Sequence, residues 1–500
     1  MGGNTTSSKA VLRNIVHAFS AWVLPLCLSF VVTRVVVRSL GTLDYGIYAL
    51  VLGFVSYSFN FSISRAITRF LAADRMASHK DKIRGIVSAT ILLTICVASF
   101  GSAVVVTLSS WLVRDVFSIE PFLQDKAVTA IRIGAAMVSA LVIGQLGTAV
   151  FHGMQRFDVY SKIQNATSVV TMLGNLILAY LGWGLLALLY WNLAASVIFS
   201  TINLLGARAM LAEIGVLYIP SRESILTVLR YSAGVIGYQA IGNAFFLFER
   251  GWIISKLGAE ELTYYAVPMT MAIFLQGFIS SLNLVLFSLT SELSEDRNRL
   301  IRLYHTATRS VMLIVFIVVI SLVACGRLFL SLWLGPDFGE HSAVLLSVQA
   351  VAFGLASIGV VAFQTAEGLG HPGFNFRNIA IGILAALIVA VLLTAPYGSL
   401  GVAYGRVVCF VIPMVAVIDF ERRYLGGFRA NFWLRNFARL FAGSVTAFLV
   451  EVSILNLVPS SWLTLIAAVA AGILTYASVL LALGYLTPED RRLVSRILAS

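Results

Sequence analysis

Apolar residues fill most of this chain in blocks of about 20 residues, separated by short charged or Gly/Pro-containing turns. Blocks of that length predict α-helices that cross a membrane, because hydrocarbon offers no hydrogen-bond partner to an open strand edge. We predict about fourteen spans from these blocks. They are residues 14–37, 45–70, 84–110, 128–151, 160–181, 185–207, 228–250, 263–290, 303–326, 342–366, 376–395, 399–418, 438–458 and 462–486.

Basic residues are distributed unevenly between the two sides of these predicted spans. Alternate loops, here called the basic side, hold about 25 of the 35 Lys and Arg residues, and the opposite loops hold about seven. This bias marks the cytoplasmic side of a membrane protein, and with an even number of spans it predicts both termini in the cytoplasm. The longest opposite loop, near residues 111–126, has about 16 residues, too few for a folded domain.

Composition agrees with a membrane protein and explains the net charge. Hydrophobic residues make up 59% of the 500 residues and charged residues 12%, whereas soluble domains are roughly 45–50% apolar and about a quarter charged. The net charge of +12 comes from the basic-side loops without an aromatic-basic binding module, so we predict no nucleic acid partner. The four cysteines lack metal-ligand spacing and no Gly-rich phosphate loop occurs, so we predict no metal and no other cofactor.

The two halves of the chain resemble one another at a near-constant offset, which indicates a duplication. The matched pairs are Leu40-Gly41 with Leu257-Gly258, residues 80–83 with 297–300, Trp111 with Trp333, and Gly182 with Gly398. An even number of spans separates equivalent positions, so the two copies have the same orientation. Parallel bundles of this kind are typical of transporters, with the pathway between them.

The predicted fold is therefore an all-α polytopic membrane protein of about fourteen transmembrane helices, with two six-helix bundles related by a pseudo-two-fold axis and two further C-terminal helices. The expected parts are residues 1–210, 211–425 and 426–500. Between the last two parts, Glu421–Arg439 alternates arginine with aromatic residues. We expect this segment to lie against anionic head groups; binding of a partner protein is the alternative.

Ionisable side chains inside the predicted spans are candidates for function, because each costs about 2.5–3.5 kcal/mol at the membrane centre. Arg65 is one such residue, and the repeat places Leu282 at the equivalent position. A polar lining of the first, second, seventh and eighth spans suits a diphosphate with a sugar, since arginine pairs with phosphate oxygens and sugars need amide and hydroxyl partners. The predicted substrate-binding residues are Arg34, Arg65, Gln239, Asn243, Arg250, Gln276 and Asn283.

Each of these residues also has a structural interpretation that the sequence leaves open. Arginines near helix ends, such as Arg34 and Arg250, can extend to head groups, and polar stripes can join neighbouring helices. Glu249 and Glu451 are candidate carboxylates for coupling to a cation. Alternatively, Glu249 pairs with Arg250, and Glu451 pairs with another helix or lies near the surface.

Short motifs in order along most of the chain carry a family resemblance. They are Leu40-Gly41…Asp44-Tyr45-Gly46, Ser64-Arg65…Arg69-Phe70, Gly153-Met154-Gln155-Arg156-Phe157-Asp158, Leu332-Trp333-Leu334-Gly335-Pro336-Asp337 and Leu486-Thr487-Pro488-Glu489-Asp490. In these motifs the chain resembles the polysaccharide flippases (O-antigen, exopolysaccharide and teichoic-acid type) of the MOP exporter superfamily. Many relatives carry an Asp-Arg-like pair near the end of the seventh span, where this chain has Glu249-Arg250.

The resemblance implies an alternating-access cavity in a protein of the cytoplasmic (inner) membrane. It also implies transfer of an undecaprenyl-pyrophosphate-linked oligosaccharide to the outer leaflet for cell-surface polysaccharide synthesis. The implied partners are that substrate, membrane lipids, and a polysaccharide polymerase with its chain-length machinery.

Two rival functions fit the same composition. A multidrug or cation antiporter of the same superfamily typically has an acidic cation site in the first span, where this chain has Arg34 and Arg38 and no carboxylate. A membrane-bound polysaccharide polymerase or ligase needs convergent acid, base and arginine groups on an external loop, and these short loops offer only scattered charges. We therefore predict a flippase and not an enzyme.

Overall fold

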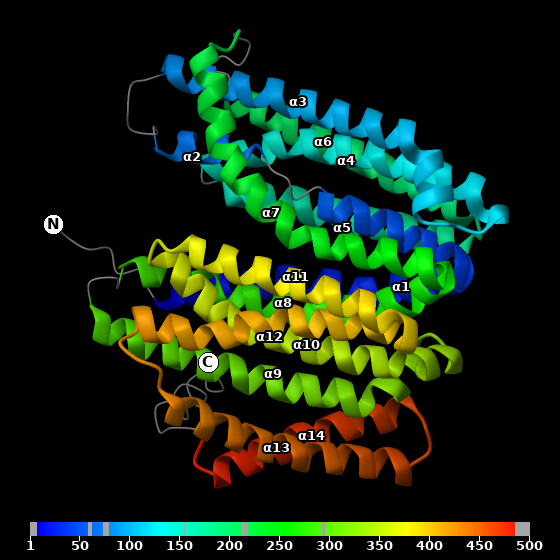
Figure 1. Ribbon diagram of the computed structural model, residues 1–500, viewed down its shortest axis with the longest axis vertical. Coiled ribbons are helices and arrows are strands. Elements are labelled where there is room, and N and C mark those ends of the chain that lie inside the picture. The colour runs from blue at the N-terminus through cyan, green and yellow to red at the C-terminus, as the bar shows by residue number, and fades with distance from the viewer. Residues whose placement is uncertain are drawn as a thin grey trace. The chain divides into compact units, whose positions relative to one another are not determined.

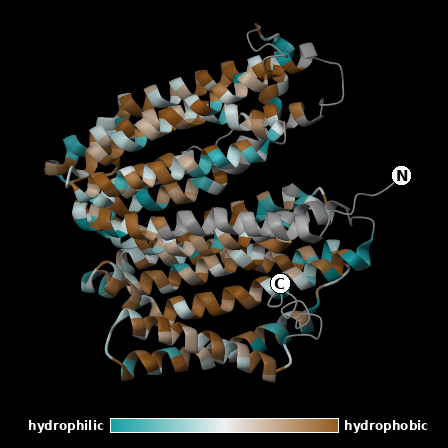
Figure 2. Cartoon of the chain, turned by 180° about the vertical axis from the view of Figure 1, so that it is seen from behind, coloured by the Kyte–Doolittle hydropathy of each residue, from teal (hydrophilic) through white to brown (hydrophobic). Residues whose placement is uncertain are grey.

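The computed structural model describes residues 8–58, 63–73, 80–154, 156–211, 219–292 and 296–485, and within these ranges the chain forms helices and no strand. Figure 1 shows these helices along the chain. Eleven helices of the described part are long and apolar enough to cross a membrane. Hydrophobic residues run along the middle of the helices and hydrophilic residues gather toward their ends (Figure 2). The predicted all-α polytopic membrane fold is confirmed.

The chain divides into two compact units, Met1–Thr263 and Tyr264–Ser500. The first unit contains α1 (Ser8–Ser58), α2 (Arg65–Ala73), α3 (Lys80–Trp111), the π-helix η1 (Leu112–Val116), the 3-10 helix η2 (Pro121–Leu123), α4 (Gln124–Gly153), α5 (Phe157–Tyr180), α6 (Gly184–Met210) and α7 (Arg222–Leu257). α8 (Ala259–Glu292) begins in the first unit and continues in the second.

α1 holds two of the predicted spans. Its helix is interrupted at Gly41, where φ is 71° and ψ is 174°. A positive φ is strained for residues with a Cβ and open to glycine, so the chain turns there from the first predicted span into the second. The second predicted span then ends with α2, across residues outside the described ranges.

Close packing of α4 on α6 depends on small residues. A Cβ added at Gly144 would overlap Ser200, and one added at Gly147 would overlap Asn203. The same approach lets Ser200 Oγ donate a hydrogen bond to the Ala140 carbonyl at 2.6 Å. Small residues that let backbones approach, with hydroxyl bonds between helices, are the usual means of packing helices in lipid.

The turn at Gly41 packs against the turn between α7 and α8, on the side opposite the basic loops. Thr263 Oγ1 donates a hydrogen bond to the Thr42 carbonyl at 2.6 Å, and Thr42 Oγ1 donates to Glu260 Oε1 at 2.9 Å. Gly46 lies directly against the backbone of Ala259, where a Cβ would overlap. The starts of the second and eighth predicted spans are therefore joined.

On the basic side, the turn between α4 and α5 carries an exposed ion pair. Arg156 Nε donates to Asp158 Oδ1 at 3.0 Å, and Arg156 Nη2 donates to Oδ2 at 3.2 Å. The hydrogen bond from Arg156 lowers the pKa of the Asp158 carboxyl. Both residues belong to a motif that carries the family resemblance, and here they pair with each other in an exposed turn.

The second unit contains α9 (Arg297–Trp333), α10 (Pro336–Gly368), α11 (Pro372–Tyr397), α12 (Ser399–Tyr424), α13 (Ala430–Leu457) and α14 (Trp462–Ala482). α12 packs on α10 and α11, and α9 packs on α10. α13 and α14 lie side by side against α9 (Figure 1). The last two helices thus form a pair attached to one helix of the unit.

α8 is fastened to α10 where a proline interrupts its backbone hydrogen bonds. Pro268 has no N–H, so it cannot bond to the Tyr264 carbonyl one turn earlier. Ser342 Oγ donates to that carbonyl at 2.8 Å, and Gln349 Nε2 donates to the Tyr265 carbonyl at 3.2 Å. A side chain of α10 therefore takes the place of the absent Pro268 N–H at the Tyr264 carbonyl, and a second side chain of α10 bonds to the next carbonyl.

Candidate substrate-binding site

Arg250 is buried on α7, with only 8% of its surface exposed. Its guanidinium carbon lies 5.0 Å from the centroid of the Tyr57 ring, and its Nη1 donates a weak hydrogen bond to the Phe246 carbonyl at 3.3 Å. An aromatic face attracts a cation, more strongly where water is excluded. Arg250 is thus held inside the first unit rather than extended to head groups.

Gly53 on α1 makes the space for the Arg250 side chain. A Cβ at Gly53 would overlap Cδ and Nε of Arg250. The arginine therefore crosses α1 at a point where the helix surface is bare backbone. Sequence reasoning missed this glycine, because a glycine inside a helix in one sequence has many structural explanations.

A cavity of about 190 Å³ lies beside Arg250 in the first unit. Its walls come from α1, α3, α4, α7, η1 and the residue that follows η1. The lining residues are Leu50, Val51, Phe54, Val105, Leu112, Phe117, Ile131, Gly134, Leu247 and Arg250. Of these lining residues, Arg250 alone carries a charge. Its buried Nε has no hydrogen-bond partner among the described residues.

As a lining residue, Arg250 can offer guanidinium N–H donors to an anionic or carbonyl oxygen in this cavity. Guanidinium groups present several fixed N–H donors that match phosphate and carboxylate oxygens. Leaving such a donor buried and unbonded costs about 1–3 kcal/mol. A ligand with an oxygen acceptor therefore binds this site more favourably than a ligand that offers only apolar surface.

Asn243 and Arg250 both contact the end of α1 at Tyr57. Asn243 Nδ2 donates to the Tyr57 carbonyl at 3.0 Å. The Tyr57 ring stacks on Phe246 with centroids 4.4 Å apart and an angle of 19° between the planes. Asn243 thereby fixes α1 on α7 and holds Tyr57 against the Arg250 guanidinium.

A family model described as polysaccharide biosynthesis protein matches residues 35–343, more than half of the chain. The chain belongs to this family. No curated protein sequence is a significant match to it. The matched range contains α7 and the cavity beside Arg250, so the site lies in the part of the chain that defines the polysaccharide biosynthesis family.

Solved structures share the fold of this chain. The lipid II flippase MurJ in an inward closed conformation is similar with a TM-score of 0.77 and 10% identity, over 93% of this chain and 98% of that one. An inward-facing MATE multidrug transporter of the MOP superfamily is similar with a TM-score of 0.68 and 15% identity, over 82% and 98%.

A third similar structure is a MOP superfamily transporter from Pyrococcus furiosus, described by the reverse polarity of its binding pocket. Its TM-score is 0.51 at 17% identity, over 85% of this chain and 93% of that one. The predicted resemblance to transporters of the MOP superfamily is confirmed for the fold. At these identities the similarity establishes a shared fold.

The remaining predicted substrate residues are placed only in part. Arg34 is half-buried on α1, and Gln276 is half-buried on α8 in the second unit. The side chains of Arg65, Gln239 and Asn283 lie outside the described residues. The structure therefore brings Asn243 and Arg250 together at Tyr57, and the roles of the others stay predictions.

The two carboxylates predicted for coupling are both fully buried. Glu249 lies on α7, next to Arg250 in the sequence. Glu451 on α13 accepts a hydrogen bond from Ser321 Oγ of α9 at 2.7 Å. Gly472 of α14 lies directly against the Glu451 carboxyl, where a Cβ would overlap. Glu451 therefore sits where α9, α13 and α14 meet, in the second unit.

Proposed function

We propose that this membrane protein is a flippase for an undecaprenyl-pyrophosphate-linked oligosaccharide in cell-surface polysaccharide synthesis. It works by alternating access, with both termini in the cytoplasm and its basic loops on that side of the inner membrane. The observation that carries the proposal is Arg250, a buried arginine that is the one charged residue lining an otherwise apolar cavity of the first unit. The family description and the similarity to a lipid II flippase support it.

The chemistry of such a substrate fits this site. A pyrophosphate head offers several anionic oxygens to the Arg250 donors, and charge-assisted hydrogen bonds are roughly twice as strong as neutral ones. In the proposed cycle, Arg34, Arg65 and Arg250 hold the head group, and Gln239, Asn243, Gln276 and Asn283 contact the sugar. No step breaks a covalent bond, so the protein acts as a transporter rather than an enzyme.

A multidrug or cation antiporter is the second candidate, favoured by the similarity to MATE transporters. The charge of the site argues against it. The residues that line the cavity include one arginine and no carboxylate. A cationic drug would be repelled by Arg250, whereas an anionic head group would be attracted.

The proposal is tested by replacing Arg250 with alanine and measuring surface polysaccharide in producing cells at equal protein level. We expect Arg250→Ala to reduce export strongly and Arg250→Lys to restore only part of it, because lysine keeps the charge without the planar fork. Arg132→Ala is the matched control, since Arg132 is an exposed arginine of α4 bonded to Ser109. Unchanged export in Arg250→Ala, or an equal loss in the control, overturns the proposed site.

A further inference from the structure

The start of α13 is fixed to α12 by a buried carboxylate. Glu421 near the end of α12 is fully buried. Its Oε1 accepts a hydrogen bond from Trp433 Nε1 at 2.8 Å, and its Oε2 accepts one from the Arg429 backbone N–H at 3.2 Å. The Trp433 ring is therefore held in one orientation before any ligand arrives.

A groove of about 430 Å³ runs along the outer face of α13 from this tryptophan. It is lined by Trp433, Leu434, Phe437, Ala438 and Phe441. Leu434, Phe437 and Phe441 are 69%, 50% and 56% exposed. At 1.5 Å per residue the groove extends about 12 Å along the helix from its basic-side end. It is an apolar track that begins at the predicted membrane interface and leads inward.

The wall of this groove is rigid because it packs on neighbouring rings. Phe437 meets Phe316 of α9 edge to face, with ring centroids 5.1 Å apart, and stacks on Phe441 at 6.5 Å. Aromatic pairs in these geometries add about 0.5–1.5 kcal/mol beyond their buried area. With Trp433 bonded to Glu421, the groove is preformed.

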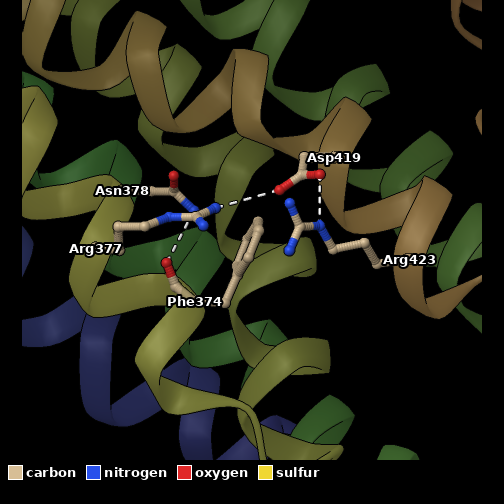
Figure 3. Close-up of polar contacts among 5 residues, drawn as sticks. All are labelled: Phe374, Arg377, Asn378, Asp419 and Arg423. Atoms are coloured by element: carbon tan, nitrogen blue, oxygen red, sulfur yellow. Dashed lines mark hydrogen bonds and ion pairs between the residues drawn. The ribbon is translucent and has the colours of Figure 1, made fainter.

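Arginines near the basic-side ends of the helices of the second unit differ in what they already bind. Arg377 and Arg423 share the Asp419 carboxylate, at 3.2 and 2.6 Å (Figure 3). Arg439 donates to the Gly484 carbonyl at 3.3 Å. Arg435 is exposed and makes no hydrogen bond or ion pair with any residue of the described ranges.

Arg435 is the guanidinium best placed to bind a ligand of the groove. It follows Leu434 in the sequence and precedes Ala438 by one turn, so it borders the groove. Side chains on a helix lean toward its N-terminus, which directs Arg435 toward the interfacial end. Exposed Arg429 lies immediately before the helix at the same end.

We propose that this groove binds one anionic phospholipid of the cytoplasmic leaflet, with an acyl chain along Trp433–Phe441 and the phosphate on Arg435 and Arg429. Charge complementarity selects the anionic lipid: exposed Arg435 and Arg429 bring positive charge to this end of α13, and a basic residue near an anionic head group contributes about 1 kcal/mol. The apolar track selects a lipid over a soluble anion. This binding is independent of the transported substrate and of the Arg250 site.

The test compares two phospholipids with identical acyl chains, phosphatidylglycerol and phosphatidylethanolamine. The full-length protein is purified with an equal mixture of both, delipidated stepwise, and the retained lipids are counted by native mass spectrometry. We expect retained phosphatidylglycerol in excess, and a decrease of about fivefold in Arg435→Gln, the effect of one arginine near an anionic lipid. Ala438→Trp, which fills the groove without removing charge, removes the tightly held lipid.

Arg208→Gln is the matched control, because Arg208 is an exposed arginine at the basic-side end of α6 in the first unit. We expect its lipid retention to equal that of the unaltered protein. Equal retention of the two phospholipids, an equal loss in Arg208→Gln, or retention unchanged by both Arg435→Gln and Ala438→Trp overturns the proposal. So does preferential retention of an added prenyl phosphate over phosphatidylglycerol.

Discussion

At the scale of single residues, the position of the Arg250 side chain depends on Gly53. A buried guanidinium is expensive unless it is paired, and here the Tyr57 ring and the Phe246 carbonyl compensate part of that cost. Gly53 supplies the space in which this arrangement fits. The site therefore depends on the absence of one Cβ on α1 as much as on the charge on α7.

Replacing Gly53 by valine is expected to displace the Arg250 side chain, because the new Cβ would overlap Cδ and Nε. Overpacking of this kind typically costs about 1–3 kcal/mol. Thermal unfolding of the purified protein measures the loss as a lower Tm. Gly101→Val on α3 is the matched control, since nothing lies within 4 Å of a Cβ at Gly101. Equal Tm values for the two variants would contradict the close packing of Arg250 on Gly53.

Single residues are also where sequence reasoning was least complete. Arg250 could be predicted as a functional residue from the sequence, because a charged side chain inside an apolar block carries a high free-energy cost in the membrane. Whether it faced head groups or the interior stayed open, since that depends on Gly53 and Tyr57, both distant along the chain. The cavity lining was not predicted, because Val105 or Ile131 looks like any other apolar residue of a membrane helix.

At the scale of helices, the joined turns at Thr42 and Thr263 follow the sequence repeat. At the offset that aligns Gly41 with Gly258, residue 42 corresponds to residue 259 and residue 46 to residue 263. The bond from Thr263 to Thr42 and the contact of Gly46 with Ala259 are therefore equivalent contacts, as in a two-fold interface. The contact of Thr263 with Thr42 is a hydrogen bond, and the contact of Gly46 with Ala259 is direct packing on the backbone.

Thr263→Val is expected to lower the Tm, because valine keeps the shape of threonine and removes the hydrogen bond to the Thr42 carbonyl. A buried hydrogen bond contributes about 0.5–1.5 kcal/mol. Thr107→Val on α3 is the control, since exposed Thr107 bonds only to its own helix at Ala103. If both variants unfold at the same temperature, the joined turns contribute nothing to stability.

Glu451 provides a second prediction at this scale, about the junction of α9, α13 and α14. Glu451→Gln keeps the volume and an oxygen acceptor for Ser321, so we expect unchanged Tm and unchanged transport. Glu451→Ala leaves Ser321 without its partner beside an empty space, and we expect a clearly lower Tm. Loss of transport in Glu451→Gln at an unchanged Tm would instead mark Glu451 as a coupling carboxylate.

Helix positions were predicted well by apolar blocks, and helix ends less well. The block at 303–326 is part of α9, which begins at Arg297 after Asp296 accepts a hydrogen bond from the Arg299 backbone N–H at 3.1 Å. A first turn stabilised in this way is made of polar residues. The apolar block used to predict the helix therefore begins after the helix itself has begun. The separation of the first two spans at Gly41 was predictable, because charge and glycine coincide there.

At the scale of the whole molecule, the duplication predicted from weak sequence matches has a backbone counterpart. Gly41 and Gly258 have φ values of 71° and 93°, and Gly182 and Gly398 have φ values of 71° and 56°. Each pair turns the chain between consecutive helices in matching positions of the two halves. The repeat was detectable because such turns tolerate few residues other than glycine.

The proposed function is transfer of an anionic lipid-linked sugar across a membrane by means of Arg250. Its most direct test is a vesicle assay with a fluorescent undecaprenyl-pyrophosphate-linked oligosaccharide, placed in one leaflet and detected in the other by a membrane-impermeant glycosidase. We predict that the purified protein accelerates transfer over protein-free vesicles and that Arg250→Ala abolishes most of the acceleration, while Arg132→Ala does not. Transfer at the protein-free rate with the unaltered protein, or full acceleration with Arg250→Ala, would contradict the account.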